Sequence, residues 1–248
     1  MADPIIQAFE EAIKLIFSGN PEVFAVVFRS IYASGLGVIL ACLWGIPIGI
    51  IIGLYSFRGK WVIKGFFHAF IGIPTVALGL LLYLLFSKQG TLGFLHVLYT
   101  VNGIAIGQAI LITPIIVSFT TSALGASDVQ IRDLARTLGA FDITTNLAVM
   151  RETIWSIALA VVAAFNRAFG ELGIAMIVGG NIFQQTRVLT TSIAVETTQG
   201  QFPVAIAYGL LLITIVIAIT MTINLAEKLK ENEITWKRPR FWKSKLVD

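Results

Sequence analysis

The chain has 248 residues, of which 56% are hydrophobic and 13% are charged, with a formal net charge of +4 and a mean hydropathy of +0.85. Soluble domains carry about 45–50% apolar and about 25% charged residues, so this composition excludes a chain that folds mainly in water. Two His and one Cys also exclude a disulfide framework and a zinc site with the usual four ligands. The composition therefore predicts an all-α integral membrane protein.

The first apolar segment, Ile5–Phe17, is too short to cross a bilayer, which needs about 20 apolar residues in a helix. Glu10, Glu11 and Lys14 also interrupt it. Its apolar residues recur at helical spacing, which is typical of a helix lying on a membrane surface. We therefore expect residues 1–22 to form an extracytoplasmic amphipathic helix.

Five later segments are long and apolar enough to be transmembrane helices. They are Ser30–Leu54, Val62–Phe86, Val101–Ala123, Thr153–Val178 and Pro203–Ala226. Pro47, Pro74 and Pro114 fall inside the first three, and a proline in mid-span kinks a helix because it lacks the N–H donor. The sequence thus predicts a transmembrane domain over residues 23–226 with bent helices.

The distribution of Lys and Arg predicts the orientation. With the N-terminus outside and the C-terminus in the cytoplasm, the inner side holds 13 of the 18 basic residues. Lys14, Lys88 and Arg187 would lie outside, and Arg29 and Arg167 at or within spans. This asymmetry fits the positive-inside rule. Residues 227–248 would then be a basic cytoplasmic tail that anchors at the membrane surface.

We find no internal repeat of the kind that many single-chain transporters carry. Five spans without a repeat are too few to enclose a regulated pathway alone, so we expect a homodimer with the pathway at its two-fold interface. The apolar stretch Val188–Val195 covers only part of a bilayer. It predicts that the outer loop 179–202 re-enters the protein, where other helices cover its backbone.

The predicted cytoplasmic loop 125–152 carries a short amphipathic helix. Ser127, followed three residues later by Gln130, fits a capping box that would start this helix. Apolar residues then recur at helical spacing, and Gly139 is placed to end the helix. Such a connector is either a simple surface helix or a docking element for a partner protein.

The same segment resembles the EAA motif of ABC importer permeases. The resemblance rests on Asp133, Leu134, Ala135, Arg136, Thr137, Leu138, Gly139 and Ala140, in which Asp133 takes the Glu position and Leu134 departs from the first Ala. In that family this coupling helix sits in a cleft of a separate ATPase subunit. The resemblance implies that Asp133, Leu134, Ala135, Arg136, Leu138, Gly139 and Ala140 make this contact.

Polar residues lie within the fourth apolar segment, where charges must be paired or turned inward. Arg167 and Glu171 are one helical turn apart and predict either a structural ion pair or a positive lining for an anion path. We group Asn166, Pro74 and Thr75 with them as candidates for the translocation pathway. His68 in the second span is a further candidate.

The outer loop is rich in hydroxyl groups and backbone donors. Asn181, Thr186, Arg187, Thr190, Thr191 and Glu196 are its candidate residues. They would hold an oxyanion transiently, form a polar lining, or dock a partner.

Two motifs there resemble tungstate permeases. One is Arg167-Ala168-Phe169-Gly170-Glu171-Leu172-Gly173; the other is Gly179-Gly180-Asn181-Ile182 followed by Thr186-Arg187-Val188-Leu189-Thr190-Thr191. Molybdate permeases share the Arg-x-x-Gly-Glu core and are less similar afterwards.

The resemblance implies the transmembrane domain of a type I ABC importer for tungstate. An extracytoplasmic binding protein would deliver the anion, and two ATPase subunits would bind ATP and Mg and drive transport. We expect no cofactor, metal or catalytic residue in this chain, and the sequence has no phosphate-binding Gly-x-x-x-x-Gly-Lys-Ser/Thr loop. Molybdate or sulfate import is the alternative, and an ion channel or secondary transporter using Arg167 and Glu171 is a more distant one.

Overall fold

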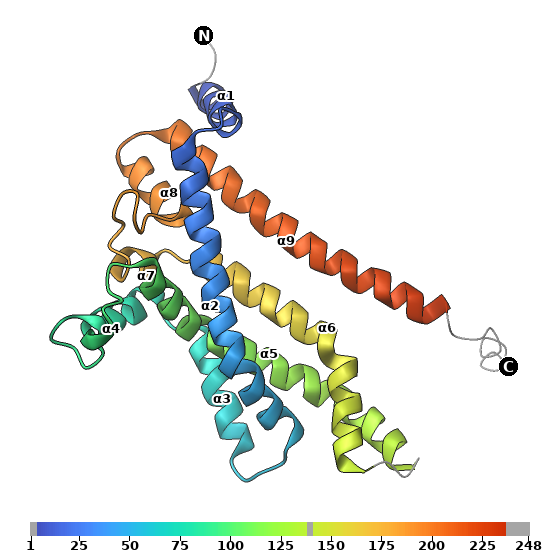
Figure 1. Cartoon of the computed structure of the whole chain (residues 1–248). Helices are drawn as coiled ribbons and strands as arrows, with labels where there is room; N and C mark the ends of the chain where they lie inside the picture. Colours follow the sequence, from blue (N-terminus) through green and yellow to red (C-terminus); the bar gives the residue numbers. More distant parts are fainter. Residues whose placement is uncertain (1–3, 138–140, 237–248) are drawn as a thin grey trace.

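The computed structural model describes residues 4–137 and 141–236 and is built from helices (Figure 1). In chain order they are α1 (Pro4–Phe17), α2 (Pro21–Leu54), α3 (Lys60–Ile71), α4 (Thr75–Phe86), the 3-10 turn η1 (Gly93–Leu95), α5 (Val101–Thr137), α6 (Asp142–Phe169), α7 (Gly173–Ile177), α8 (Leu189–Thr198) and α9 (Phe202–Trp236). Within the described residues four helices are long and apolar enough to cross a membrane, or five if the bent α3–α4 pair is one span.

Helix α2 begins nine residues before the predicted first span. Asn20 caps it, because its side-chain oxygen accepts a hydrogen bond from the N–H of Glu22 at 2.9 Å, and Pro21 has no N–H that needs a partner. The helix has 34 residues and is therefore about 51 Å long at 1.5 Å per residue. It exceeds the thickness of a bilayer core of about 30 Å and must project beyond it.

The predicted span over Val62–Phe86 is broken at Pro74 into two helices, a sharper bend than the predicted kink. Helices α3 and α4 of 12 residues each meet at an angle of 98°. Gly72 ends α3, and Pro74 precedes α4. Proline disfavours a helical conformation in the residue before it and cannot donate to the preceding turn, so the chain turns here instead of kinking. A helix of 12 residues is about 18 Å long, so neither half crosses a bilayer alone.

Helix α5 continues from the third span into the predicted coupling segment. Its backbone is helical from Val101 to Thr137, so Ser127 lies inside the helix and does not start a separate one. The predicted separate start of a helix at Ser127 is therefore wrong, because α5 runs through this position without a break. Leu138, Gly139 and Ala140 lie outside the described residues.

The fourth span also differs from its predicted limits. Helix α6 begins at Asp142 and ends at Phe169, and the short helix α7 follows after Gly170, Glu171 and Leu172. The apolar run extends to Val178 because α7 is itself apolar. Hydropathy alone does not register the break at Gly170.

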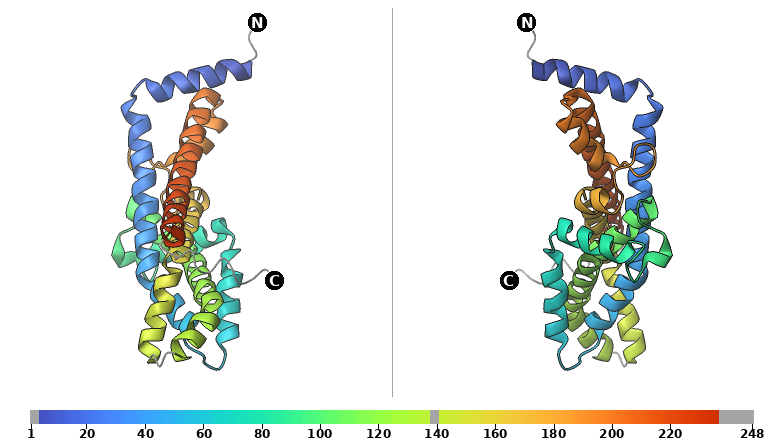
Figure 2. Two further views of the ribbon diagram at one scale, coloured as in Figure 1. Left: turned by 90° about the vertical axis from the view of Figure 1, so that its right-hand side faces the viewer. Right: turned by 90° about the vertical axis from the view of Figure 1, so that its left-hand side faces the viewer.

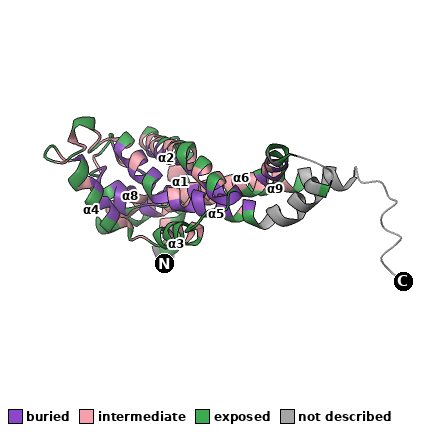
Figure 3. Ribbon diagram, turned by 90° about the horizontal axis from the view of Figure 1, so that it is seen from below, coloured by how far each residue is buried: buried purple, intermediate pink, exposed green. Residues whose placement is uncertain are grey.

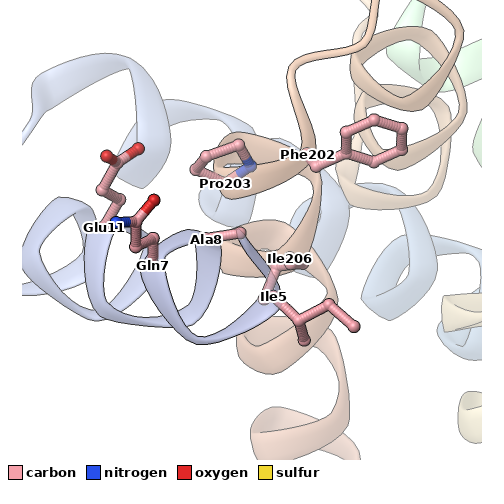
Figure 4. A pocket seen from close by; sticks show the side chains of 7 residues that line it. All are labelled: Ile5, Gln7, Ala8, Glu11, Phe202, Pro203 and Ile206. Atoms are coloured by element: carbon pink, nitrogen blue, oxygen red, sulfur yellow. The ribbon is translucent and has the colours of Figure 1, made fainter. Parts of the chain in front are cut away.

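Helix α1 lies across the end of the molecule near the starts of α2 and α9 (Figure 2). The prediction of a helix here is confirmed, and Ile6, Phe9 and Phe17 expose 55%, 43% and 85% of their surface. An open hollow of about 490 Å³ is lined by α1 and the first turn of α9. Figure 4 shows Ile5 and Ala8 of α1 opposite Pro203 and Ile206.

The core of the chain surrounds α5, where buried residues concentrate (Figure 3). Helix α2 packs along α5 through a row of small residues: Gly37, Gly45, Gly49 and Gly53 face Ala105, Ile116, Thr120 and Leu124. Small side chains allow transmembrane helices to approach closely, which increases van der Waals contact where lipid removes the hydrophobic driving force.

Candidate functional site

The buried carboxylate of Glu171 lies where α6, α7 and α8 meet. Its side chain is 2% exposed, and Oε2 accepts a hydrogen bond from Nη1 of Arg167 at 3.1 Å. The other oxygen, Oε1, accepts from the N–H of Ile174 at 3.1 Å, in the first turn of α7. The prediction that Arg167 and Glu171 pair along one turn is therefore confirmed. The carboxylate thus accepts a hydrogen bond from a backbone N–H in the first turn of α7 that has no acceptor within that helix.

The Arg167 side chain is 38% exposed, in contrast to its buried partner. A guanidinium has five N–H donors, and one of them is used by Glu171. The pair is neutral overall, so its positive potential is strongest on the exposed side of Arg167 and weak around Glu171. This geometry is that of a structural ion pair, and it leaves guanidinium N–H donors of Arg167 that do not contact the carboxylate.

The start of α4 packs against α7 beside this pair. A Cβ added to Gly173 would lie 3.0 Å from Oγ1 of Thr75, and one added to Gly79 would lie 3.3 Å from the carbonyl oxygen of Gly173. The break at Pro74 aims α4 at this contact. The structure therefore brings Pro74 and Thr75, predicted as pathway residues, next to the segment that follows Glu171.

Helix α8 is fixed to the same junction by two hydroxyl groups. Thr190 Oγ1 donates to the carbonyl oxygen of Glu171 at 2.8 Å. Ser30 Oγ on α2 accepts from the N–H of Leu189 at 2.8 Å and donates to the carbonyl oxygen of Val26. Ser30 thus caps a helix that lies 159 positions away along the chain.

Asn166 points away from the ion pair, although it precedes Arg167 directly. Its Nδ2 donates to Oγ1 of Thr220 on α9 at 2.9 Å, and its Oδ1 has no hydrogen-bond partner within the described chain. Consecutive residues on a helix are rotated by about 100°, so Asn166 and Arg167 face different neighbours. Asn166 therefore connects α6 to α9.

In the predicted outer loop, two of the candidate threonines form hydrogen bonds with the backbone of the loop itself. Thr186 is 1% exposed; its hydroxyl accepts from the N–H of Ile182 at 2.8 Å and donates to the carbonyl oxygen of Gly179 at 2.6 Å. Thr191 is fully buried and bonds both the N–H and the carbonyl of Val188. Asn181 has a positive φ of 47°, a conformation that asparagine tolerates better than most residues. A role for these residues toward an anion stays a prediction.

Arg187 and Glu196 form an ion pair within this loop. Nη1 of Arg187 lies 3.6 Å from Oε1 of Glu196, and the guanidinium lies 5.1 Å from the centroid of the Phe183 ring. Both charged side chains are largely buried, at 17% and 16% exposure. The pair joins the start of α8 to its last turns and stiffens the loop.

The predicted ATPase contact lies only partly within the described residues. The backbone of Asp133, Leu134, Ala135 and Arg136 is helical as part of α5, whereas their side chains lie outside those that the structure describes. Leu138, Gly139 and Ala140 lie outside the described residues altogether.

Sequence reasoning missed two polar residues that hold the junction together. Ser30 caps α8, and Gln108 on α5 is 3% exposed and donates from Nε2 to the carbonyl oxygen of Ala168 at 2.9 Å. Gln108 could have been found, because an amide in an apolar span must find a buried partner. Ser30 gave no such signal, since a serine at a span boundary is common.

Comparison with protein families gives one family model, described as the inner membrane component of binding-protein-dependent transport systems, which matches residues 45–230. This range includes α3 to α8, the Arg167–Glu171 pair and the predicted coupling segment.

The chain is also similar to curated proteins over most of its length. A tungstate uptake system permease protein of Peptoclostridium acidaminophilum is 36% identical and covers 88% of this chain and 96% of its own length. A probable anion ABC transporter permease of Haloferax volcanii is 35% identical over 77% of this chain and 84% of its own. A tungstate permease of Campylobacter jejuni is 33% identical over 86% and 89%. Sulfate and molybdenum permeases match at 27% identity.

Proposed function

Since the chain belongs to the family of inner membrane components of binding-protein-dependent transport systems, we propose that it translocates tungstate as the permease subunit of an ATP-driven ABC importer. The observation that supports tungstate as the substrate is the 36% identity to a tungstate permease over 96% of that protein's length. The lower identity of 27% to sulfate and molybdenum permeases supports tungstate over these anions.

Our proposed topology has five spans, with the bent α3–α4 pair as the second, the N-terminus outside and the C-terminus in the cytoplasm. The transmembrane domain covers 23–226, with α1 on the outer surface, a re-entrant loop at 179–202 and a basic tail at 227–248. Burial of α8 residues such as Leu189 and Thr191, at 0% exposure each, supports the re-entrant loop. The count of basic residues supports the orientation.

The permease would work as a homodimer with two ATPase subunits and an extracytoplasmic oxyanion-binding protein. ATP and Mg would be held by the ATPase, with no cofactor or catalytic residue in this chain. Asp133 to Ala140 would form the docking segment. The helix is continuous from Val101 to Thr137, past Pro114, which supports this role because a continuous helix transmits a displacement of its cytoplasmic end to the buried span.

Closure of the two ATPases would turn the permease outward, and hydrolysis would reset it. The anion would pass the outer loop and then the junction around Arg167. The donors that Arg167 directs away from Glu171 support this route, and the ion pair with Glu171 keeps the charge tolerable within an apolar span.

Uptake by proteoliposomes tests the function. They should contain this chain, its ATPase and its binding protein, and receive tungstate, molybdate or sulfate at equal concentration. We expect ATP-dependent uptake of tungstate to exceed that of the other anions. Greater uptake of molybdate or sulfate would contradict tungstate as the substrate and would still agree with an ATP-driven importer. Uptake that ignored ATP and followed an ion gradient would reject the importer itself.

Replacement of Gly139 tests the docking segment. We expect Gly139→Trp to abolish co-purification of the ATPase, because an indole would hold the two surfaces apart. Gly35→Trp is the matched control, since a Cβ added at Gly35 meets no atom within 4 Å. Retention of the ATPase by the Gly139 variant would show that docking occurs elsewhere.

A further inference from the structure

A small hollow lies between α2, α3 and α5, far along the chain from the Arg167–Glu171 junction. Lys64 and His68 line it from α3, and Ser118, Thr121 and Ser122 line it from α5. Lys64 and His68 are four residues apart, as are Ser118 and Ser122, so each pair lies on one face of its helix. Two basic side chains therefore stand opposite a row of hydroxyl groups.

Ser118 is the innermost donor of this group. It is 3% exposed, and its Oγ has no hydrogen-bond partner within the described chain. A buried hydroxyl without a partner loses free energy comparable to a missing hydrogen bond. The hydroxyl of Thr121, which also lines the hollow, donates to the carbonyl oxygen of Gly49 at 3.2 Å, so its proton is already used. Ser118 is thus available to an oxygen that enters the hollow.

The basic side chains that line the hollow are Lys64 and His68. Its lining residues include no carboxylate, and the other walls are the apolar side chains of Ile52, Phe67 and Val117. Ile52 and Val117 are 5% and 1% exposed. Apolar walls lower the local dielectric constant, so a cation at the mouth attracts an anion more strongly than it would in water.

The size of the hollow limits what enters it. Its enclosed space is about 10 Å³, which admits a single water-sized group. Lys64 is half-buried and His68 and Ser122 are exposed, so these three side chains stand at the mouth. A tetrahedral anion therefore fits with one oxygen directed at Ser118 and the remaining oxygens held by Lys64 and His68.

We propose that this hollow is an anion site that binds one tetrahedral oxyanion, either a free ion or the phosphate of an acidic lipid headgroup. Lys64 supplies a formal charge and three N–H donors, and Ser118 and Ser122 supply hydroxyl donors. The site bridges α3 and α5, and it requires neither the proposed substrate nor the proposed partners. Failure of the uptake experiment would therefore leave it standing.

The test uses the full chain in nanodiscs of neutral phosphatidylcholine, titrated with sulfate and with tungstate by calorimetry. The site variants are Lys64→Gln and Ser118→Ala. Lys88→Gln and Ser156→Ala are matched controls, because both residues are exposed and lie outside the hollow. We expect each site variant to weaken oxyanion binding about tenfold, the effect of losing one charge-assisted hydrogen bond, and the controls to leave it unchanged. Should Ser118→Ala unfold, the exposed Ser122→Ala takes its place.

A second arm distinguishes the source of the oxyanion. Nanodiscs containing phosphatidylglycerol are compared with neutral ones by native mass spectrometry. Retention of this lipid by the wild type, with its loss in Lys64→Gln, would identify the headgroup phosphate as the ligand. Titration without such retention would identify the free ion. If neither anion nor lipid distinguishes the site variants from the controls, the hollow holds water alone and the proposal is wrong.

Discussion

Helices α5 and α9 of this inner membrane permease are both apolar, yet they have opposite surroundings. The apolar window of α5 has a mean hydropathy of 1.8 and is 78% buried inside the chain, whereas that of α9 reaches 2.6 and is 17% buried. Figure 1 shows the C-terminal half of α9 lying apart from the other helices. The more apolar helix is thus the more exposed one.

The difference teaches that small residues, more than hydropathy, decide which helix a membrane chain buries. Lipid tails are as apolar as leucine, so an apolar side chain gains little by leaving them. Helix α5 is buried because α2 presents a row of glycines to it. Helix α9 has one glycine in its described span, Gly209, and a Cβ there would meet nothing within 4 Å.

The largest effect is expected where the glycine row is broken. A Cβ at Gly49 would lie 2.7 Å from Cβ of Thr120, so Gly49→Leu must separate α2 from α5. We expect a destabilisation of about 3 kcal/mol, the upper end of the usual cost of overpacking, seen as a lower melting temperature in detergent and a loss of monodisperse protein.

The matched control for this change is Gly35→Leu on the same helix, where a side chain enters open space. Equal melting temperatures for the two variants would mean that the close contact between α2 and α5 is not what orders the core.

A smaller effect is expected at the ion pair that joins α6 to α7. Glu171→Gln keeps an oxygen that accepts from the N–H of Ile174 and removes the charge that Arg167 faces. We expect a loss of about 1–2 kcal/mol, below the value for a fully buried pair because Arg167 is 38% exposed. Thermal unfolding measures it, with the exposed Glu10→Gln as control. A loss no larger than that of the control would show that the pair contributes nothing to stability.

The hydrogen bond between α6 and α9 should contribute less still. A double-mutant cycle with Asn166→Ala and Thr220→Val isolates the 2.9 Å contact between these side chains. We expect a coupling free energy of about 0.6 kcal/mol, the average for such bonds between membrane helices. If the losses of stability in the two single variants add up to that of the double variant, the hydrogen bond between α6 and α9 does not form in the solubilised protein.

The smallest effect is expected on the exposed face of α9. Ile213 is 54% exposed, so Ile213→Ala should change the stability of the detergent-solubilised chain by less than about 0.5 kcal/mol. Ile112→Ala on α5 is the buried counterpart at 0% exposure and should cost about 2–5 kcal/mol. A large loss at Ile213 would indicate that this face is covered by a second copy of the chain.

Much of the candidate site could be read along the sequence because its partners are close in sequence. Arg167 and Glu171 are four residues apart, and a helix places such residues side by side. The break at Pro74 was visible as a proline in a span, yet its angle of 98° was not, because packing of α4 against α7 sets the direction. Thr190 and Ser30 reach this junction from distant segments, and no local pattern announces such contacts.

The sequence by itself determined that this chain is helical, that it is a membrane protein, and where its apolar segments lie, because these follow from composition and from local spacing. Tertiary structure alone decided which apolar helix is central, where the second and fourth spans break, and that Ser118 faces Lys64 and His68 across a hollow. The physical reason is that hydropathy measures the transfer of a segment into lipid, whereas burial, direction and polar contacts depend on which surfaces fit each other at close range.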